Sequence, residues 1–304
     1  MSPKPKTFFR SLLAAGVLVI SCGKAAPPPP PEAGARPFVD DLGRRLALPP
    51  RPRRIISTSP EVTEILFAVG AGDRLVGVVR GCDWPPEARE LPAVGDFSNV
   101  SLERVASLDP DLILTTGHEQ ERMMAQLEGL GVPLVAFMAA DVASVRRNVA
   151  AVGEIVGEEE KAAAVVAAFD AELAAVEAEV RSIPEAARPR VYLEISPEPL
   201  MTVAEGSFVH EALLRAGGVN IGADLPRPYC RLEPELVIAR DPEVIVLAHS
   251  AVAPAAVTSR TGWEGIAAVR SGRICEINPD LILRAGPRLG RGIATLHELF
   301  YREP

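Results

Sequence analysis

The sequence predicts an α/β protein built of two similar lobes that a single long helix joins. A short pattern occurs twice, at 101–114 and at 233–246, and each copy reads as a helix, an Asp-Pro break and an apolar strand. Between the copies, residues 142–183 are almost wholly helix formers. Because a repeated unit generally folds in the same way twice, we expect two lobes with parallel sheets flanked by helices.

The first lobe is expected to span 38–141, beginning with a small hairpin at 38–48. The expected strands cover 54–57, 75–79, 112–115 and 132–137, and the expected helices cover 60–69, 101–107 and 119–130. Ser59 and Ser101 stand where N-caps are needed, and Gly70 can end the first helix. Such alternation is typical of a parallel sheet with helices on both faces.

The linker at 142–183 is expected to contain one long spacer helix over 158–182. Apolar residues recur along it at three- to four-residue spacing, no glycine interrupts it, and Pro184 ends it. The second lobe is expected to span 184–304. Its expected strands cover 190–195, 244–247 and 273–277, and its expected helices cover 207–216, 234–240, a segment around Trp263 and a segment after Pro287.

The amino terminus has the features of a bacterial lipoprotein signal. Three basic residues precede an apolar stretch at 12–20, which is shorter than the roughly 20 residues that span a bilayer. The stretch ends in Val-Ile-Ser-Cys, which resembles a lipobox with Cys22 as the lipidated residue. We therefore expect a signal peptide over 1–21, a proline-rich tether over 22–37, and a lipid-anchored protein in the periplasm or at the cell surface.

Composition bears on several other classes of function. The formal net charge is −8 and no Lys/Arg run is present, which argues against nucleic acid as a partner. Beyond Cys22, the cysteines are Cys82, Cys230 and Cys275, and none belongs to a C-x-x-C unit. We therefore expect no metal site and no cofactor. Cys275 is expected to be a buried small hydrophobe, while Cys82 and Cys230 are either free thiols or a disulfide. No nucleophile-elbow glycines surround Ser59, so a secreted hydrolase is the weaker alternative.

Candidate ligand contacts follow the predicted strands, because ligands of parallel α/β sheets bind outside the carboxyl ends of the strands. The loops there carry aromatic, cationic and potential metal-ligating side chains: Trp84, Phe97, Tyr229, Arg80, Arg227, Arg231, His118, His249, Cys82 and Cys230. Aromatic rings and arginines suit a large planar or amide-fringed ligand. Ordinary packing is the alternative for the rings, and a solvated rim for the arginines. If His118 and His249 face one another they can ligate haem iron or a corrinoid cobalt, and otherwise they bond to backbone.

Several segments resemble the substrate-binding proteins of ABC importers that carry cobalamin, iron siderophores and haem. The resemblance rests on Arg-Ile-Ile-Ser-Thr-Ser-Pro at 54–60, Cys-Asp-Trp-Pro-Pro-Glu-Ala at 82–88, Ser-Leu-Glu-Arg at 101–104 and Arg-Ala-Gly-Pro-Arg at 284–288. It covers the chain from about Pro52 to the end. It implies the class III fold of periplasmic binding proteins, with two α/β lobes and one long helix, and a binding protein rather than an enzyme.

Within that group, the segments at 83–86 and 284–288 look most like the cobalamin binders. The resemblance implies that cobalamin or another corrinoid lies between the lobes, with a ferric siderophore or haem as the alternative ligand. The positions that match ligand contacts are Trp84, Phe97, Tyr229 and Asp280. The aromatic lining is thinner here than in the cobalamin binders, since Gly81 and Thr116 stand where those proteins have large rings.

Glu103 and Glu235 occupy matching places in the repeated pattern, near the second position of each helix. In the resembled family the matching glutamates, one for each lobe, dock onto arginines of the membrane permease. The resemblance therefore implies an ABC permease dimer with its ATPase subunits as the partner of a monomeric binding protein. The alternative is that both carboxylates only complement a helix dipole, which contributes about 0.3–1 kcal/mol each.

Overall fold

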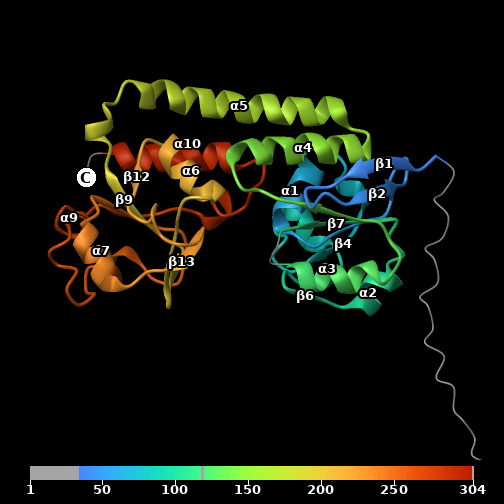
Figure 1. Cartoon of the computed structure of the whole chain (residues 1–304), viewed down its shortest axis with the longest axis horizontal. Coiled ribbons are helices and arrows are strands. Elements are labelled where there is room, and N and C mark those ends of the chain that lie inside the picture. Colours follow the sequence, from blue (N-terminus) through green and yellow to red (C-terminus); the bar gives the residue numbers. More distant parts are fainter. Residues whose placement is uncertain (1–33, 118–119, 303–304) are drawn as a thin grey trace, which may run out of the picture. The chain divides into compact units, whose positions relative to one another are not determined.

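The computed structural model describes residues 34–117 and 120–302, which form two lobes and the helices that link them (Figure 1). The signal peptide, Cys22, most of the tether and His118 lie outside these described residues. Arg36 and Pro37, the last two residues of the expected tether, belong to the first strand. Within the described ranges, no helix is both long enough and apolar enough to cross a membrane.

The first lobe is built on a six-stranded sheet in the order β6-β5-β4-β3-β7-β8. Its strands are β3 (Ile55–Ser57), β4 (Leu75–Val79), β5 (Ala93–Asp96), β6 (Asn99–Val100), β7 (Leu112–Thr116) and β8 (Leu134–Phe137). All pair in parallel except β6 with β5. The helices are α1 (Pro60–Ala68), η1 (Gly72–Arg74), η2 (Pro86–Glu90), α2 (Leu102–Ser107) and α3 (Glu121–Glu128), and the hairpin is β1 (Arg36–Val39) with β2 (Arg45–Leu48).

The second lobe contains a parallel sheet in the order β12-β9-β14-β15 and an antiparallel sheet in the order β10-β11-β13. Its strands are β9 (Arg190–Glu194), β10 (Ser196–Pro197), β11 (Leu200–Val203), β12 (Val219–Asn220), β13 (Tyr229–Arg231), β14 (Val244–Leu247) and β15 (Ile274–Glu276). Its helices are η4 (Glu185–Ala187), α6 (Phe208–Arg215), α7 (Pro234–Arg240), α8 (Pro254–Val257), α9 (Ala267–Arg270), η5 (Pro279–Leu281) and α10 (Leu289–Tyr301). The short antiparallel sheet was not predicted, because its strands are too short for a period-two pattern to be recognised.

Two helices link the lobes: α4 (Val142–Val156) and α5 (Glu159–Arg181). Gly157, with φ 71°, ends α4 in the left-handed conformation that glycine adopts without strain. The spacer helix α5 has 23 residues, close to the expected length. Its apolar stripe joins two cores, since Ala162 packs into the first-lobe core whereas Phe169 and Leu173 pack into the second. Apolar packing therefore ties α5 to both lobes.

Strand β14, in the parallel second-lobe sheet, is buried on both faces. Val244 and Val246 of β14 belong to one core cluster, while Ile245 and Leu247 belong to another. This two-sided burial explains why the strand reads as a continuous apolar run. The expected helix around Trp263 is wrong. Gly262 has φ 81°, and Trp263 is buried in a turn before α9.

Candidate ligand-binding site

Trp84 lies in the loop between β4 and η2, and 46% of its surface is exposed. The guanidinium carbon of Arg288 lies 4.7 Å from the centroid of its ring. Arg288 stands at the start of α10, in the second lobe. A cation at this distance over a tryptophan face is attracted by the ring quadrupole. The loop after β4 therefore contacts the other lobe through an aromatic side chain.

Glu64 makes a second contact between the lobes. It lies on α1, only 4% of its surface is exposed, and its carboxylate accepts hydrogen bonds from two arginines of the second lobe. Arg288 donates from Nε and Nη2 at 2.8 and 2.6 Å, and Arg284 donates from Nη1 at 3.0 Å. Fork-shaped arginine–carboxylate pairs of this kind are strong and geometrically specific. Removal of one partner would leave a buried charge uncompensated.

Arg284 extends this contact to the loop that carries Trp84. Its guanidinium donates to Oδ1 of Asp83 at 2.8 Å and to the carbonyl oxygen of Gly81 at 3.2 Å. It also pairs with Asp280 of its own lobe at 2.9 Å. Burial lowers the pKa of Arg284, but hydrogen bonds to Asp83 and Glu64 outweigh this effect, so the pKa lies above its usual value. Asp280, predicted as a ligand contact, is thus part of a charge cluster at the lobe contact.

Arg80 and Phe97 lie in the first lobe beside this loop. Arg80 pairs with Asp96 at 2.6 Å, and both side chains are largely exposed. The hydrogen bond between them raises the pKa of Arg80 and lowers that of Asp96. Phe97 is half-buried, and its carbonyl oxygen accepts a bond from the side-chain amide of buried Gln120. The Arg80 side chain is thus engaged by a carboxylate, while the turn at Phe97 is held from inside the lobe.

Tyr229 begins β13 in the second lobe, with 38% of its surface exposed. Among the described residues, Trp84 and Tyr229 are the aromatic members of the set of exposed large hydrophobic side chains. Arg227 and Arg231, on either side of Tyr229, are also exposed. Each lobe therefore presents one exposed ring from a segment that the sequence had marked.

His249 is bonded through both ring nitrogens. Its Nε2 lies 3.0 Å from Oε1 of Glu194, and its Nδ1 accepts from the backbone N–H of Ala251 at 3.2 Å. Because Nδ1 accepts, the proton belongs on Nε2, which donates to Glu194. Glu194 is fully buried and also accepts two bonds from Arg260, at 2.5 and 2.7 Å. In this structure His249 braces the end of β9 and presents no unoccupied nitrogen to a metal.

The described cysteines are free thiols. Cys82 is buried and accepts a bond from Oγ1 of Thr63 at 3.2 Å, and burial raises the pKa of its thiol to about 11. Cys230 is buried as well, and its thiol donates to the carbonyl oxygen of Arg227. Cys275 is only half-buried on β15, so it is less enclosed than expected. Within the described part of the chain, no cluster of three or more His, Cys, Asp or Glu residues could hold a metal ion.

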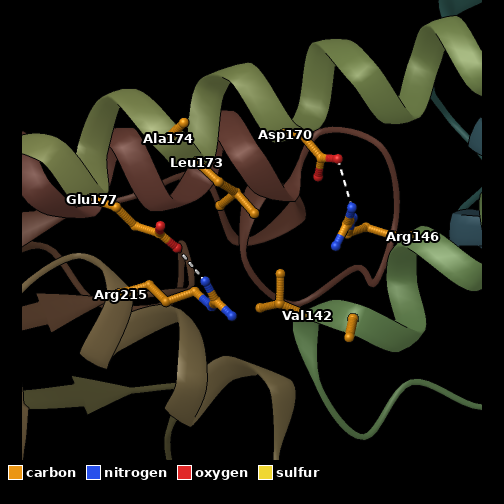
Figure 2. Close-up of a pocket in the computed structure, with 8 residues that line it drawn as sticks. Val142, Arg146, Asp170, Leu173, Ala174, Glu177 and Arg215 are labelled. Carbon is orange, nitrogen blue, oxygen red and sulfur yellow. Dashed lines mark hydrogen bonds and ion pairs between the residues drawn. The ribbon is translucent and has the colours of Figure 1, made fainter.

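A cavity of about 210 Å³ lies between α4, α5 and α6 (Figure 2). Two ion pairs border it: Arg146 of α4 pairs with Asp170 of α5, and Arg215 of α6 pairs with Glu177 of α5. Its walls come from the linker and from α6, not from loops at the ends of strands. The cavity is therefore separate from the candidate ligand site, and its ion pairs fasten α5 to both neighbours.

The two glutamates of the repeated pattern lie in equivalent, exposed positions. Glu103 is in the first turn of α2, which Ser101 caps, and Glu235 is in the first turn of α7, which Pro234 begins. Both helices start where expected.

Glu64 is the residue that the sequence-based site most clearly missed. The sequence did carry a sign that Glu64 is buried: its carboxylate stands between Thr63 and the apolar pair Ile65 and Leu66, in a helix that is otherwise mostly apolar. A charged residue at a buried position needs a partner. Its partners, however, stand more than 200 residues later in the chain.

Comparison with known proteins agrees with this architecture. The chain belongs to the periplasmic binding protein family, whose model matches residues 55–281. It is 31% identical over 304 residues to an uncharacterized ABC transporter substrate-binding lipoprotein of Bacillus subtilis, covering 96% of this chain and 95% of that protein. Among solved structures, the periplasmic vitamin B12-binding protein of Vibrio cholerae matches with a TM-score of 0.73 and 27% identity, over 83% of this chain and 98% of the other.

A haem-binding protein is equally similar in structure. The periplasmic haem-binding protein of Roseiflexus, in its apo form, matches with a TM-score of 0.73 and 28% identity, over 82% of this chain and 98% of the other. These comparisons confirm the class III fold. They also confirm the resemblance to the substrate-binding proteins of ABC importers for cobalamin, siderophores and haem. The chain is thus a substrate-binding protein of that group.

Proposed function

We propose that this protein is the extracytoplasmic binding component of an ABC importer that captures cobalamin or a related corrinoid between its two lobes. The observation that carries the proposal is the pair of exposed aromatic rings, Trp84 and Tyr229, one on each lobe. Exposed rings of this size need an explanation, because burial would remove a large apolar surface from water. A large ligand with a broad apolar face, contacted from both lobes, supplies one.

A second candidate ligand is haem. Tyr229 favours it, since a tyrosine side chain can ligate haem iron, and haem-binding proteins match the fold as well as the cobalamin binder does. His249 does not add to this case, because Glu194 and Ala251 occupy its ring nitrogens.

The rest of the proposal concerns delivery. Cys22 would carry a lipid anchor, as the B. subtilis relative is named a lipoprotein. The exposed glutamates Glu103 and Glu235 would then dock onto the permease dimer, whose ATPase subunits drive uptake. Exposed carboxylates suit this task, because they remain solvated in the free protein and form charge-assisted bonds with arginine on docking.

The test is a titration of the purified protein with cyanocobalamin, haemin and a ferric siderophore, followed by absorption spectroscopy. We expect saturable binding of cyanocobalamin, weakened by about 1–3 kcal/mol in both Trp84→Ala and Tyr229→Ala. Leu214→Ala is the control, since it removes an exposed apolar side chain from α6. Preferential binding of haemin or of the siderophore would show that this compound, and not cobalamin, is the ligand. Full affinity in both aromatic variants would show that Trp84 and Tyr229 do not contact the ligand.

A further inference from the structure

We propose that Arg288 is a positioning residue for the candidate site: held by Glu64, it sets the orientation in which Trp84 meets the ligand. This inference rests on the proposed function, because it concerns how the same site is prepared for its ligand. It goes beyond a list of ligand contacts, since neither Arg288 nor Glu64 needs to touch the ligand.

Trp84 is held in one orientation by its contact with Arg288. The ring stands on a loop, and 46% of its surface is exposed. A side chain that is so exposed on a loop would ordinarily sample several rotamers. The guanidinium of Arg288, 4.7 Å from the ring centroid, covers one face of the ring and favours one orientation. The ring keeps enough exposed surface for a flat ligand to stack on it.

Arg288 is itself held in place by a buried carboxylate. Its side chain is 17% exposed, and its Nε and Nη2 donate to the two oxygens of Glu64 at 2.8 and 2.6 Å. This two-point contact fixes the plane of the guanidinium, which a single bond would leave free to rotate. Glu64 lies on α1 with 2% of its side chain exposed. The plane of the guanidinium is therefore set by a buried carboxylate of the first lobe.

The loop that carries Trp84 is also held by the second lobe. Arg284 donates to the carbonyl oxygen of Gly81 and to the carboxylate of Asp83, and it shares Glu64 with Arg288. The second lobe thus holds the loop at Gly81, Asp83 and Trp84, while both arginines are anchored on α1. A ring held in this way loses little conformational freedom when a ligand stacks on it, and lower ordering costs raise affinity.

The experiment reads Trp84 directly, with no ligand present. The chain has 2 tryptophans, and Trp263 is only 1% exposed, so acrylamide quenching reports on Trp84. We expect a higher quenching constant in Arg288→Met, which loses both the ion pair and the flat cation. Arg288→Lys keeps the positive charge but loses the two-point contact with Glu64 and the flat guanidinium, so it should also raise the quenching constant. Arg291→Met is the matched control, because it removes an exposed arginine from the same helix.

The second readout is affinity for cyanocobalamin and haemin. We expect Arg288→Met to weaken binding of the ligand that the wild type takes by about tenfold. Adding Trp84→Ala should weaken binding no further than Trp84→Ala alone, because both changes remove the same ordered ring. A melting curve for each variant confirms that it is folded.

The outcomes separate this inference from the proposed function. If the wild type binds neither ligand, the proposed function fails, and quenching of the free protein still decides whether Arg288 orders the ring. Unchanged quenching in both Arg288 variants would overturn the positioning role, as would independent, additive losses of affinity in the double variant. Raised quenching with non-additive losses would establish it.

Discussion

Asp109 and Asp241 occupy equivalent places in the two lobes, and both adopt a left-handed backbone conformation, with φ 46° and 41°. Asp109 directly follows Leu108, the C-cap of α2, and Asp241 is the C-cap of α7; the first turn of each helix carries one of the exposed glutamates. The backbone carbonyl oxygen of each aspartate accepts a hydrogen bond from an arginine at the start of a central strand. Arg54, just before β3, donates to Asp109 at 2.8 Å, and Arg190 of β9 donates to Asp241 at 3.0 Å. The repeated sequence pattern is therefore a repeated three-dimensional unit, down to an unusual backbone conformation.

Replacing Asp109 by glycine should stabilise the protein, and replacing Asp241 should not. The left-handed conformation is unfavourable for residues with a Cβ, and glycine relieves about 1 kcal/mol of that cost. At Asp241 the gain is offset, because its Oδ1 accepts the backbone N–H of Ala267 at 2.7 Å. Urea denaturation of Asp109→Gly and Asp241→Gly measures the difference. Equal stabilisation by both changes would show that the Asp241 side chain contributes nothing.

Removal of the buried carboxylate of Glu64 should destabilise the protein far more than removal of an exposed ion-pair carboxylate. Glu64→Ala leaves Arg284 with only Asp83 and Asp280 as carboxylate partners and removes the ion-pair partner of Arg288. We expect a loss of about 3–5 kcal/mol in the free energy of unfolding. Asp96→Ala is the matched control, because it breaks the exposed pair with Arg80 and should change stability little. Chemical denaturation compares the two variants. A small effect of Glu64→Ala would show that water solvates the arginines at this contact.

Glu61 should make stability depend on pH. It stands in the first turn of α1, where burial raises the pKa of its carboxyl above the ordinary value of 4.5, although a hydrogen bond with Ser59 opposes the shift. The folded protein therefore holds this proton more tightly than the unfolded chain does. The stability from the neutral carboxyl is complete below pH 4.5 and is lost as the pH rises through the folded-state pKa.

Glu61→Gln should abolish this dependence, since the amide stays neutral at every pH. The measurement is the difference in unfolding free energy between wild type and Glu61→Gln from pH 4 to pH 8. We expect the variant to gain stability relative to the wild type as the pH rises. A difference that does not change with pH would mean that solvent reaches the carboxyl in the folded protein.

The double variant Glu103→Ala/Glu235→Ala tests permease docking. We expect ligand affinity and melting temperature to stay near wild type while uptake by the cognate importer is lost, because both glutamates are exposed and their proposed arginine partners lie on the permease. Glu159→Ala/Glu160→Ala is the control: it removes the same charge from two exposed first-turn glutamates of α5. Normal uptake with a small loss of stability would instead favour helix-dipole complementation.

Local signals in the sequence determined much of this fold. β4 and β14 lie where their apolar runs placed them, Ser59 and Ser101 cap α1 and α2 as expected, and α5 differs from the predicted spacer by one residue at each end. Caps, prolines and hydrophobic periodicity act over a few residues, so they can be read before the chain folds. The repeated pattern likewise predicted the two lobes and pointed to Glu103 and Glu235.

Only the tertiary structure decided which side chains meet. The sequence marked Trp84 and the Arg284–Arg288 segment, but it could not show that Arg288 covers Trp84 or that Glu64 accepts both arginines. Nor could it show that Glu194 and Ala251 engage His249. The energy of a buried ion pair depends on the geometry and burial of both partners, and these are set only when segments distant in sequence pack together.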